Sequence, residues 1–126
     1  MARANAICTE TLNQTRAITP PASTRPGGAF AAYLGRLVPL LQSEADQIRG
    51  LKRPTGGIAR DRQTLSQYLA ALGQDVAAYR ELEAAAKRGD AQTIASVEAT
   101  LRDNPAADLA TSYGLRACGT PGSTTA

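Results

Sequence analysis

Residues 65–86, with the sequence LSQYLAALGQDVAAYRELEAAA, carry the clearest structural signal in the chain. Apolar side chains recur there at steps of three and four residues, a spacing close to the heptad of packed helices. The residues of this apolar stripe are Leu65, Leu69, Leu72, Val76, Tyr79, Leu82 and Ala86. The stretch therefore predicts a long helix with one face buried against other helices, and with it an all-α fold.

Three further helical stretches are predicted around this helix, each bounded by proline or glycine. Their ranges are 3–18, 28–50 and 91–117. Pro39 lies inside the second stretch and removes one backbone hydrogen bond, which predicts a kink. Asn104–Pro105 is expected to kink or divide the last stretch. Gly89 suits the left-handed position after a helix, and Asp90 can accept hydrogen bonds from the first amides of the next helix.

The order of these stretches predicts the topology. Because short connections make consecutive helices antiparallel neighbours, we expect an up-down-up-down four-helix bundle with kinked second and fourth helices. The length suits one core, and we expect a single domain over residues 1–118. Residues 119–126 have no apolar pattern and are expected to form a disordered tail.

The chain contains two cysteines, Cys8 and Cys118, and the predicted bundle brings them to the same end. We therefore expect a disulfide between them. It would close a loop of about 110 residues and, in the chain-entropy model, stabilise the fold by roughly 4–5 kcal/mol. Such a bond persists in an oxidising compartment. The alternative is two unrelated buried thiols in a cytoplasmic protein.

The segment Tyr113-Gly114-Leu115-Arg116-Ala117-Cys118-Gly119, together with Ala6-Ile7-Cys8, resembles small extracytoplasmic helical proteins of actinobacteria. Many members of that group are anchored by an N-terminal membrane helix or a lipid. The resemblance implies a helical fold outside the cytoplasm. It implies no activity, because function in that group is largely unassigned. This sequence departs from the group because it shows neither an apolar run of roughly 18 residues nor the apolar region of a signal peptide.

Composition argues against several classes of function. The chain has no histidine, which removes the commonest general base, histidine-ligated haem and most zinc sites. A net charge of +3 and an aromatic fraction of 4% are too low for the basic face and stacking rings of a nucleic-acid binder. No Gly-x-Ser-x-Gly elbow occurs, so we expect no catalytic residues, no cofactor and no nucleic-acid partner.

Acidic side chains on the predicted helices are the candidates for metal ligands. They are Glu44, Asp46, Asp75, Glu81, Glu83 and Glu98. A di-iron bundle would also need Glu-x-x-His pairs, which this chain lacks. We therefore interpret the six carboxylates as charged surface and expect no metal site. Tyr68 and Tyr79 are interpreted as core or rim residues of the third helix.

A cluster of cations surrounds the loop between the second and third helices. Its members are Arg49, Lys52, Arg53, Arg60 and Arg62. With the amides at the start of the third helix, these cations could bind a phosphate, a sulfate or an acidic head group. A solvated loop whose cations complement a helix C-terminus is the favoured interpretation.

These observations lead to one functional hypothesis and two alternatives. The leading hypothesis is a noncatalytic extracytoplasmic helical module that binds a protein partner or the cell envelope, with the membrane involved only through an anchor. Its expected location is secreted or at the cell surface, and the alternative location is the cytoplasm. The first alternative function is a small-molecule or anion-sensing bundle, and the second is an enzyme.

Overall fold

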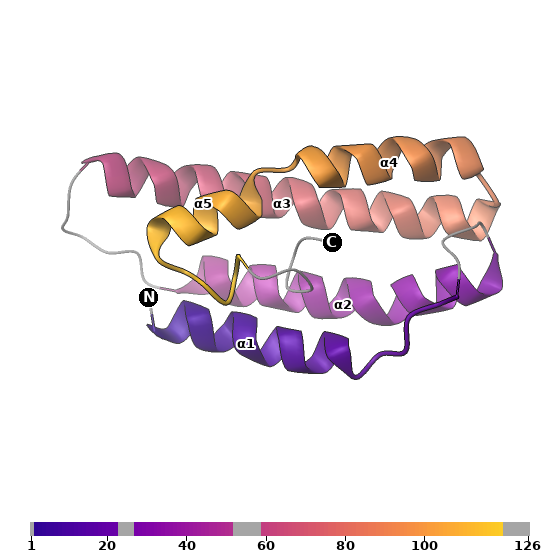
Figure 1. The fold of residues 1–126 in the computed structure, drawn as a ribbon, viewed down its shortest axis with the longest axis horizontal. Coiled ribbons are helices and arrows are strands. Elements are labelled where there is room, and N and C mark those ends of the chain that lie inside the picture. The colour runs from indigo at the N-terminus through magenta and orange to yellow at the C-terminus, as the bar shows by residue number, and fades with distance from the viewer. Residues whose placement is uncertain (1, 23–26, 52–58, 120–126) are drawn as a thin grey trace.

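The computed structural model describes residues 2–22, 27–51 and 59–119, and within these ranges the chain is all-helical. The helices are α1 (Ala2–Arg16), α2 (Gly28–Gly50), α3 (Ala59–Arg88), α4 (Ala91–Asp103) and α5 (Ala106–Tyr113). They lie alongside one another, and α4 and α5 are the two parts of the predicted fourth stretch (Figure 1). The all-α prediction is confirmed.

The long helix α3 lies at the centre of the packing. Helix α1 packs on α2, α2 packs on α3, and α3 packs on both α4 and α5. The apolar stripe predicted from residues 65–86 faces these neighbours, and Leu72 and Ala85 are fully buried. Small alanine side chains let the helices approach closely, while leucine is the most frequent large residue of the core.

The connection between α3 and α4 follows the sequence prediction. Gly89 adopts a left-handed conformation with a φ of 72°. The Asp90 amide donates to the Ala85 carbonyl oxygen at 3.0 Å, as in a Schellman motif. The Asp90 carboxylate then accepts from the Thr93 amide at 3.1 Å, which caps α4. Both predicted roles are confirmed.

Helix α5 ends earlier than predicted. Gly114 has a φ of 97°, and the Leu115 amide donates to the Ala110 carbonyl oxygen at 2.8 Å, so a second Schellman motif stops the helix. The chain then forms what we call the C-terminal turn, Leu115–Gly119. The burial of Leu115 and Cys118 holds this turn against the bundle.

Gly119, the first residue of the predicted tail of residues 119–126, is described by the structure. Gly119 belongs to the C-terminal turn, because its amide donates to the Leu115 carbonyl oxygen at 3.1 Å. A Cβ atom at this position would lie 2.9 Å from the Ala107 carbonyl oxygen, a contact that only glycine avoids. Residues 120–126 lie outside the described residues, as does the loop of residues 52–58.

Asn104 fixes the break between α4 and α5 to the central helix. Its side-chain oxygen accepts from the Ala106 amide at 2.8 Å. Its side-chain nitrogen donates to the Ala71 carbonyl oxygen of α3 at 3.0 Å. One side chain therefore caps the start of α5 and ties it to α3.

Replacing Asn104 by alanine is expected to lower the free energy of unfolding by roughly 1–3 kcal/mol, because the Ala106 amide loses its acceptor and Ala71 loses a donor. Urea unfolding measures the change. Asn104→Asp keeps the acceptor and removes the donor, so its loss should be intermediate. Asp103→Ala, at an exposed neighbour, should leave stability almost unchanged. An equal stability for the two alanine variants would contradict this role.

Candidate functional site

Four polar or charged residues are buried among the described residues, and two of them are acids. Thr11 and Thr15 donate their hydroxyls to the carbonyl oxygens of Ile7 and Leu12, both at 3.1 Å, as threonine commonly does inside a helix. Glu44 and Asp75 are fully buried, with no exposed area. The two carboxylates are therefore the unusual polar groups of the core, because acids are rarely buried in full.

Both acids occupy positions where an apolar residue is expected. Glu44 follows Leu41 by three residues and precedes Ile48 by four, so it lies on the buried stripe of α2. Asp75 follows Leu72 by three residues and precedes Tyr79 by four, so it lies on the buried stripe of α3. Since α2 and α3 pack together, the two carboxylates enter one interface from opposite sides.

Two close approaches between α2 and α3, one on each side of the acids, show how the residues of the two helices are aligned. A Cβ atom at Gly35 of α2 would lie 3.5 Å from the Glu83 carboxylate of α3. Farther along, the Arg49 guanidinium of α2 lies so close to Gly73 that a Cβ atom there would collide with it. Glu44 lies between Gly35 and Arg49 in α2, and Asp75 lies between Gly73 and Glu83 in α3. The register therefore places them opposite each other.

Tyr68 completes this group, which we call the acid–tyrosine cluster of Glu44, Tyr68 and Asp75. Tyr68 lies seven residues before Asp75 on the same face of α3 and is fully buried. Its hydroxyl has no hydrogen-bond partner. Burial, and then the charges of Glu44 and Asp75, raise the pKa of Tyr68 above its usual range, because a buried phenolate would be repelled by both carboxylates.

The carboxyl group of Asp75 is strongly affected by its surroundings. Burial, reinforced by the charge of Glu44, raises the pKa of Asp75 to about 7. Neither of its carboxylate oxygens has a hydrogen-bond partner. A buried polar group without a partner costs about 1–3 kcal/mol, so Asp75 and the Tyr68 hydroxyl both destabilise the fold. Near neutral pH this carboxyl can therefore exchange a proton.

Tyr79 borders the cluster without belonging to it. Burial, followed by the charges of Asp75 and Tyr33, raises the pKa of Tyr79 above its usual range. Its ring is buried one turn beyond Asp75. Both Tyr68 and Tyr79 are thus buried in α3, in line with their interpretation as core or rim residues of that helix.

The interpretation of all six helix-borne acids as charged surface is wrong for Glu44 and Asp75. Asp46 and Glu81 are exposed, whereas Glu83 and Glu98 are half-buried. The signal that identifies the buried pair was present in the sequence, since each acid takes a heptad position between two apolar residues. Within the described ranges, no three Asp, Glu, Cys or His side chains form a group that could hold a metal ion.

The predicted basic cluster is brought together only in part. Lys52 and Arg53 lie outside the described residues. Arg49, Arg60 and Arg62 are exposed. The Arg49 guanidinium lies over Gly73, which is 11 residues beyond Arg62 in α3 and so roughly 16 Å away along the helix axis. The cations at the start of α3 therefore do not converge with the head of Arg49.

A hollow of about 420 Å³ lies between the start of α2 and the end of α3. Its lining residues are Gly27, Gly28, Ala31, Ala86, Lys87, Arg88 and Gly89. Lys87 pairs with Glu83 at 3.1 Å and Arg88 with Asp90 at 3.5 Å, so each cation already has an acidic neighbour. The sequence does not predict this hollow, because it depends on the packing of two helix ends that lie far apart in the chain.

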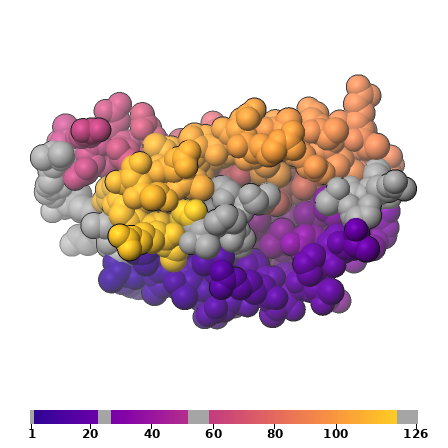
Figure 2. Space-filling model, viewed as in Figure 1, coloured from indigo at the N-terminus to yellow at the C-terminus, as the bar shows by residue number. Residues whose placement is uncertain are grey.

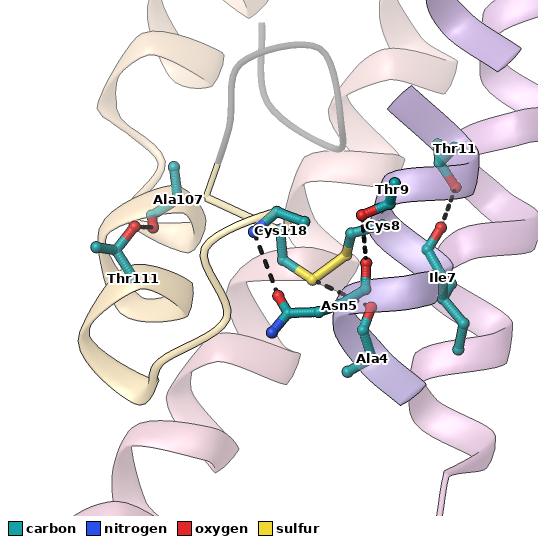
Figure 3. Close-up of a disulfide and its surroundings, with 10 residues drawn as sticks. Ala4, Asn5, Ile7, Cys8, Thr9, Thr11, Ala107, Thr111 and Cys118 are labelled. Carbon is teal, nitrogen blue, oxygen red and sulfur yellow. Dashed lines mark hydrogen bonds between the residues drawn. A yellow bond between two sulfur atoms is a disulfide. The ribbon is translucent and has the colours of Figure 1, made fainter. Parts of the chain in front are cut away.

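The disulfide between Cys8 and Cys118 is formed, as the sequence predicted (Figure 3). Its Cα atoms are 5.0 Å apart, and both cysteines are fully buried. The Cys118 sulfur lies 3.6 Å from the Ala4 carbonyl oxygen, a contact rather than a hydrogen bond because the oxidised sulfur carries no proton.

Asn5 forms a hydrogen bond between the two segments that the disulfide also joins, α1 and the C-terminal turn. Its side-chain oxygen accepts from the Ala117 amide at 3.2 Å, beside the disulfide (Figure 3). In the space-filling view, the yellow C-terminal region lies close to indigo α1 at the end where these ties form (Figure 2). The disulfide and Asn5 thus join α1 to the C-terminal turn, although α1 packs on no helix other than α2.

Comparison with known proteins does not place this fold or cluster in a family. No protein-family model matches the chain, and neither does any curated protein or solved structure.

Proposed function

We propose that this chain is a noncatalytic extracytoplasmic helical module that binds a protein partner or a component of the cell envelope. The observation that carries the proposal is the fully buried disulfide between Cys8 and Cys118. A buried structural disulfide is typical of proteins in oxidising compartments. In the part of the chain that the structure describes, no helix has the length and apolarity needed to cross a bilayer. Any attachment to the membrane therefore belongs to the proposal, as does the resemblance to actinobacterial extracytoplasmic proteins.

The topology that fits this module is an up-down-up-down bundle with kinked second and fourth helices. The sequential packing of α1 on α2, α2 on α3 and α3 on α4 supports it. Pro39 lies inside α2 and supplies no amide to the helix, which favours a bend there. The fourth helical stretch is divided at Asn104–Pro105, which favours a change of direction there.

The hydrogen bonds of the threonine hydroxyls are consistent with a noncatalytic role. The described hydrogen bonds of Thr9, Thr64, Thr100 and Thr111 run to helix carbonyl oxygens four residues earlier. Such hydroxyls serve the local helix rather than an activating base. The chain also lacks histidine, the commonest partner of a hydroxyl nucleophile.

The test is capture of a partner with the oxidised protein. Tagged protein is incubated with envelope and cytoplasmic fractions of cells that express it, with untagged protein as the competitor. The proposal predicts saturable capture of one envelope component, competition by untagged protein, and binding of that component once purified. Capture that the competitor leaves unchanged, or a binder found only in the cytoplasmic fraction, would contradict it.

The hollow between α2 and α3 favours a second candidate function, the binding of a small anion. The start of α2 presents backbone amides, since Gly27 supplies no side-chain cap, and Lys87 and Arg88 line the same space. Titration with inorganic phosphate, followed by amide NMR, tests this candidate. Saturable shifts at Gly28 and Lys87 would support it, and shifts spread over all exposed cations would contradict it.

A further inference from the structure

Helix α1 covers the bundle with few large apolar side chains. Among the helices it packs on α2 alone. Leu12 is the only large apolar residue among its buried side chains, which are Ala4, Cys8, Thr11, Leu12 and Thr15. Ile7 is half-buried and also packs against the core. Because stabilisation by burial scales with apolar area, α1 should leave its place more easily than the other helices once the disulfide is open.

The surface that holds α1 has two parts, α2 and the C-terminal turn. The turn contributes the disulfide to Cys8 and the hydrogen bond from the Ala117 amide to the Asn5 side chain, at 3.2 Å (Figure 3). The Cys118 sulfur also lies 3.6 Å from the Ala4 carbonyl oxygen. Every copy of the chain carries both this surface and the helix that fits it. Helix α1 of a second copy can therefore bind there with the same contacts.

The connection between α1 and α2 is long enough for such an exchange. It comprises residues 17–27. A chain of this length spans at most about 40 Å when extended, whereas α1 itself is roughly 22 Å long. Two of its residues are Pro20 and Pro21, and consecutive prolines favour extended backbone. The connection can thus carry α1 to a neighbouring copy.

The burial of the disulfide decides when the exchange can occur. Both cysteines are fully buried, so a thiol in solution has no access to the closed bond. The bond also joins α1 to the part of the chain that α1 would leave. Exchange is therefore confined to the reduced chain, and closure of the bond fixes whichever arrangement is present.

We propose that two copies of the reduced chain exchange α1, and that the disulfide then links them covalently. Each α1 packs on α2 and the C-terminal turn of the other copy, and Cys8 of one copy bonds to Cys118 of the other. With glutathione disulfide as the oxidant, each bond forms from two thiols and converts one glutathione disulfide into two glutathione thiols. This inference does not depend on the proposed binding of another protein or of the envelope.

The amount of dimer follows from the tether between α1 and α2. A short flexible tether gives α1 an effective concentration on the order of 1 mM at its own binding surface. A second copy competes when its concentration approaches that value. Roughly half of the reduced chains should therefore be exchanged at about 1 mM protein, and about 2% at about 10 µM.

Isotope labelling tests the exchange in the parent protein. Equal amounts of unlabelled and ¹⁵N-labelled protein are reduced with dithiothreitol, mixed at about 1 mM or about 10 µM, and oxidised with glutathione disulfide. Trypsin then releases residues 4–16 and 117–126, each with one cysteine. We expect linked peptides that join a labelled to an unlabelled chain, in covalent dimers that are about tenfold or more abundant at the higher concentration.

Matched variants show which sulfurs pair. A Cys8→Ala chain keeps only Cys118, and a Cys118→Ala chain keeps only Cys8, so neither can form the native bond alone. In their mixture, exchange places α1 of Cys118→Ala on α2 of Cys8→Ala, and one bond between the chains can form. We expect several times more covalent dimer in the mixture than in either variant alone. Circular dichroism checks that each variant is helical, and the labelled parent decides if one is not.

Two results would overturn the inference. The first is that the linked peptides of the parent always carry the same label at about 1 mM, because every disulfide then lies within one chain. The second is as much covalent dimer in either variant alone as in their mixture, which would assign the dimer to unspecific pairing of thiols.

Discussion

Replacing both Cys8 and Cys118 by alanine is expected to lower the free energy of unfolding by about 5 kcal/mol. The bond joins residues separated by 110 positions, so it removes a large amount of conformational entropy from the unfolded chain. Domains of this size are stable by only about 5–15 kcal/mol in total, and the loss is a large share of that. Urea unfolding followed by circular dichroism measures the change.

Chemical reduction provides the matched control for this prediction. The parent protein in excess dithiothreitol should unfold at the same urea concentration as the double alanine variant, because both lack the crosslink. The double variant should be insensitive to dithiothreitol. An oxidised parent that is less than about 1 kcal/mol more stable than the variant would contradict a stabilising role of the disulfide.

Loss of the disulfide should increase local opening in α1 before it does so in the other helices. Among the helices this helix packs on α2 alone, and within the described residues the disulfide and the hydrogen bond from Ala117 to Asn5 also hold it. Few tertiary contacts make local opening easier. In hydrogen exchange of the reduced protein, the amides around Leu12 in α1 should therefore exchange faster than those around Leu72 in α3.

Replacing Asp75 by asparagine is expected to stabilise the protein by roughly 4 kcal/mol at pH 8. The pKa of Asp75 rises from its ordinary value of 3.8 to about 7 in the folded protein. Between pH 4 and 7 the folded state therefore holds a proton that the unfolded state has released, and at pH 8 it carries a buried charge that asparagine lacks. The stabilisation from that proton is complete below about pH 4 and is lost as the pH rises to 7.

Comparing the stability of the parent protein with that of Asp75→Asn across pH isolates the contribution of the Asp75 carboxyl. Near pH 3 the carboxyl is neutral in both states, so the parent and Asp75→Asn should have similar stability. Between pH 4 and 7 the parent should lose stability relative to the variant. Glu44→Gln removes one cause of the raised pKa and should move this loss to lower pH. A constant difference between parent and Asp75→Asn from pH 3 to pH 8 would show that Asp75 is not buried as described.

The helices could be predicted because local chemistry determines them. The apolar spacing of residues 28–50, flanked by glycine, matches α2. Gly89 and Asp90 mark the end of α3 and the start of α4, since each has a backbone role that few other residues fill. The pairing of Cys8 with Cys118 followed from the order of the helices.

The candidate cluster depends on long-range packing and was missed for that reason. Glu44 and Asp75 each lie on an apolar stripe. Acidic side chains are rarely buried, however, so the sequence favours an exposed position for both of them. Their proximity depends on the register between α2 and α3, which involves contacts such as that of Arg49 with Gly73. Likewise, the end of α5 at Gly114 depends on the burial of Leu115 beyond it.

The central claim is that Asp75 is buried opposite Glu44 in the core of the bundle. Titration of the Asp75 side-chain carboxyl by ¹³C NMR tests it most directly, and no imidazole titrates in the same range because the chain has no histidine. We expect a midpoint near pH 7 for this carboxyl. A midpoint near its ordinary value of 3.8 would contradict it.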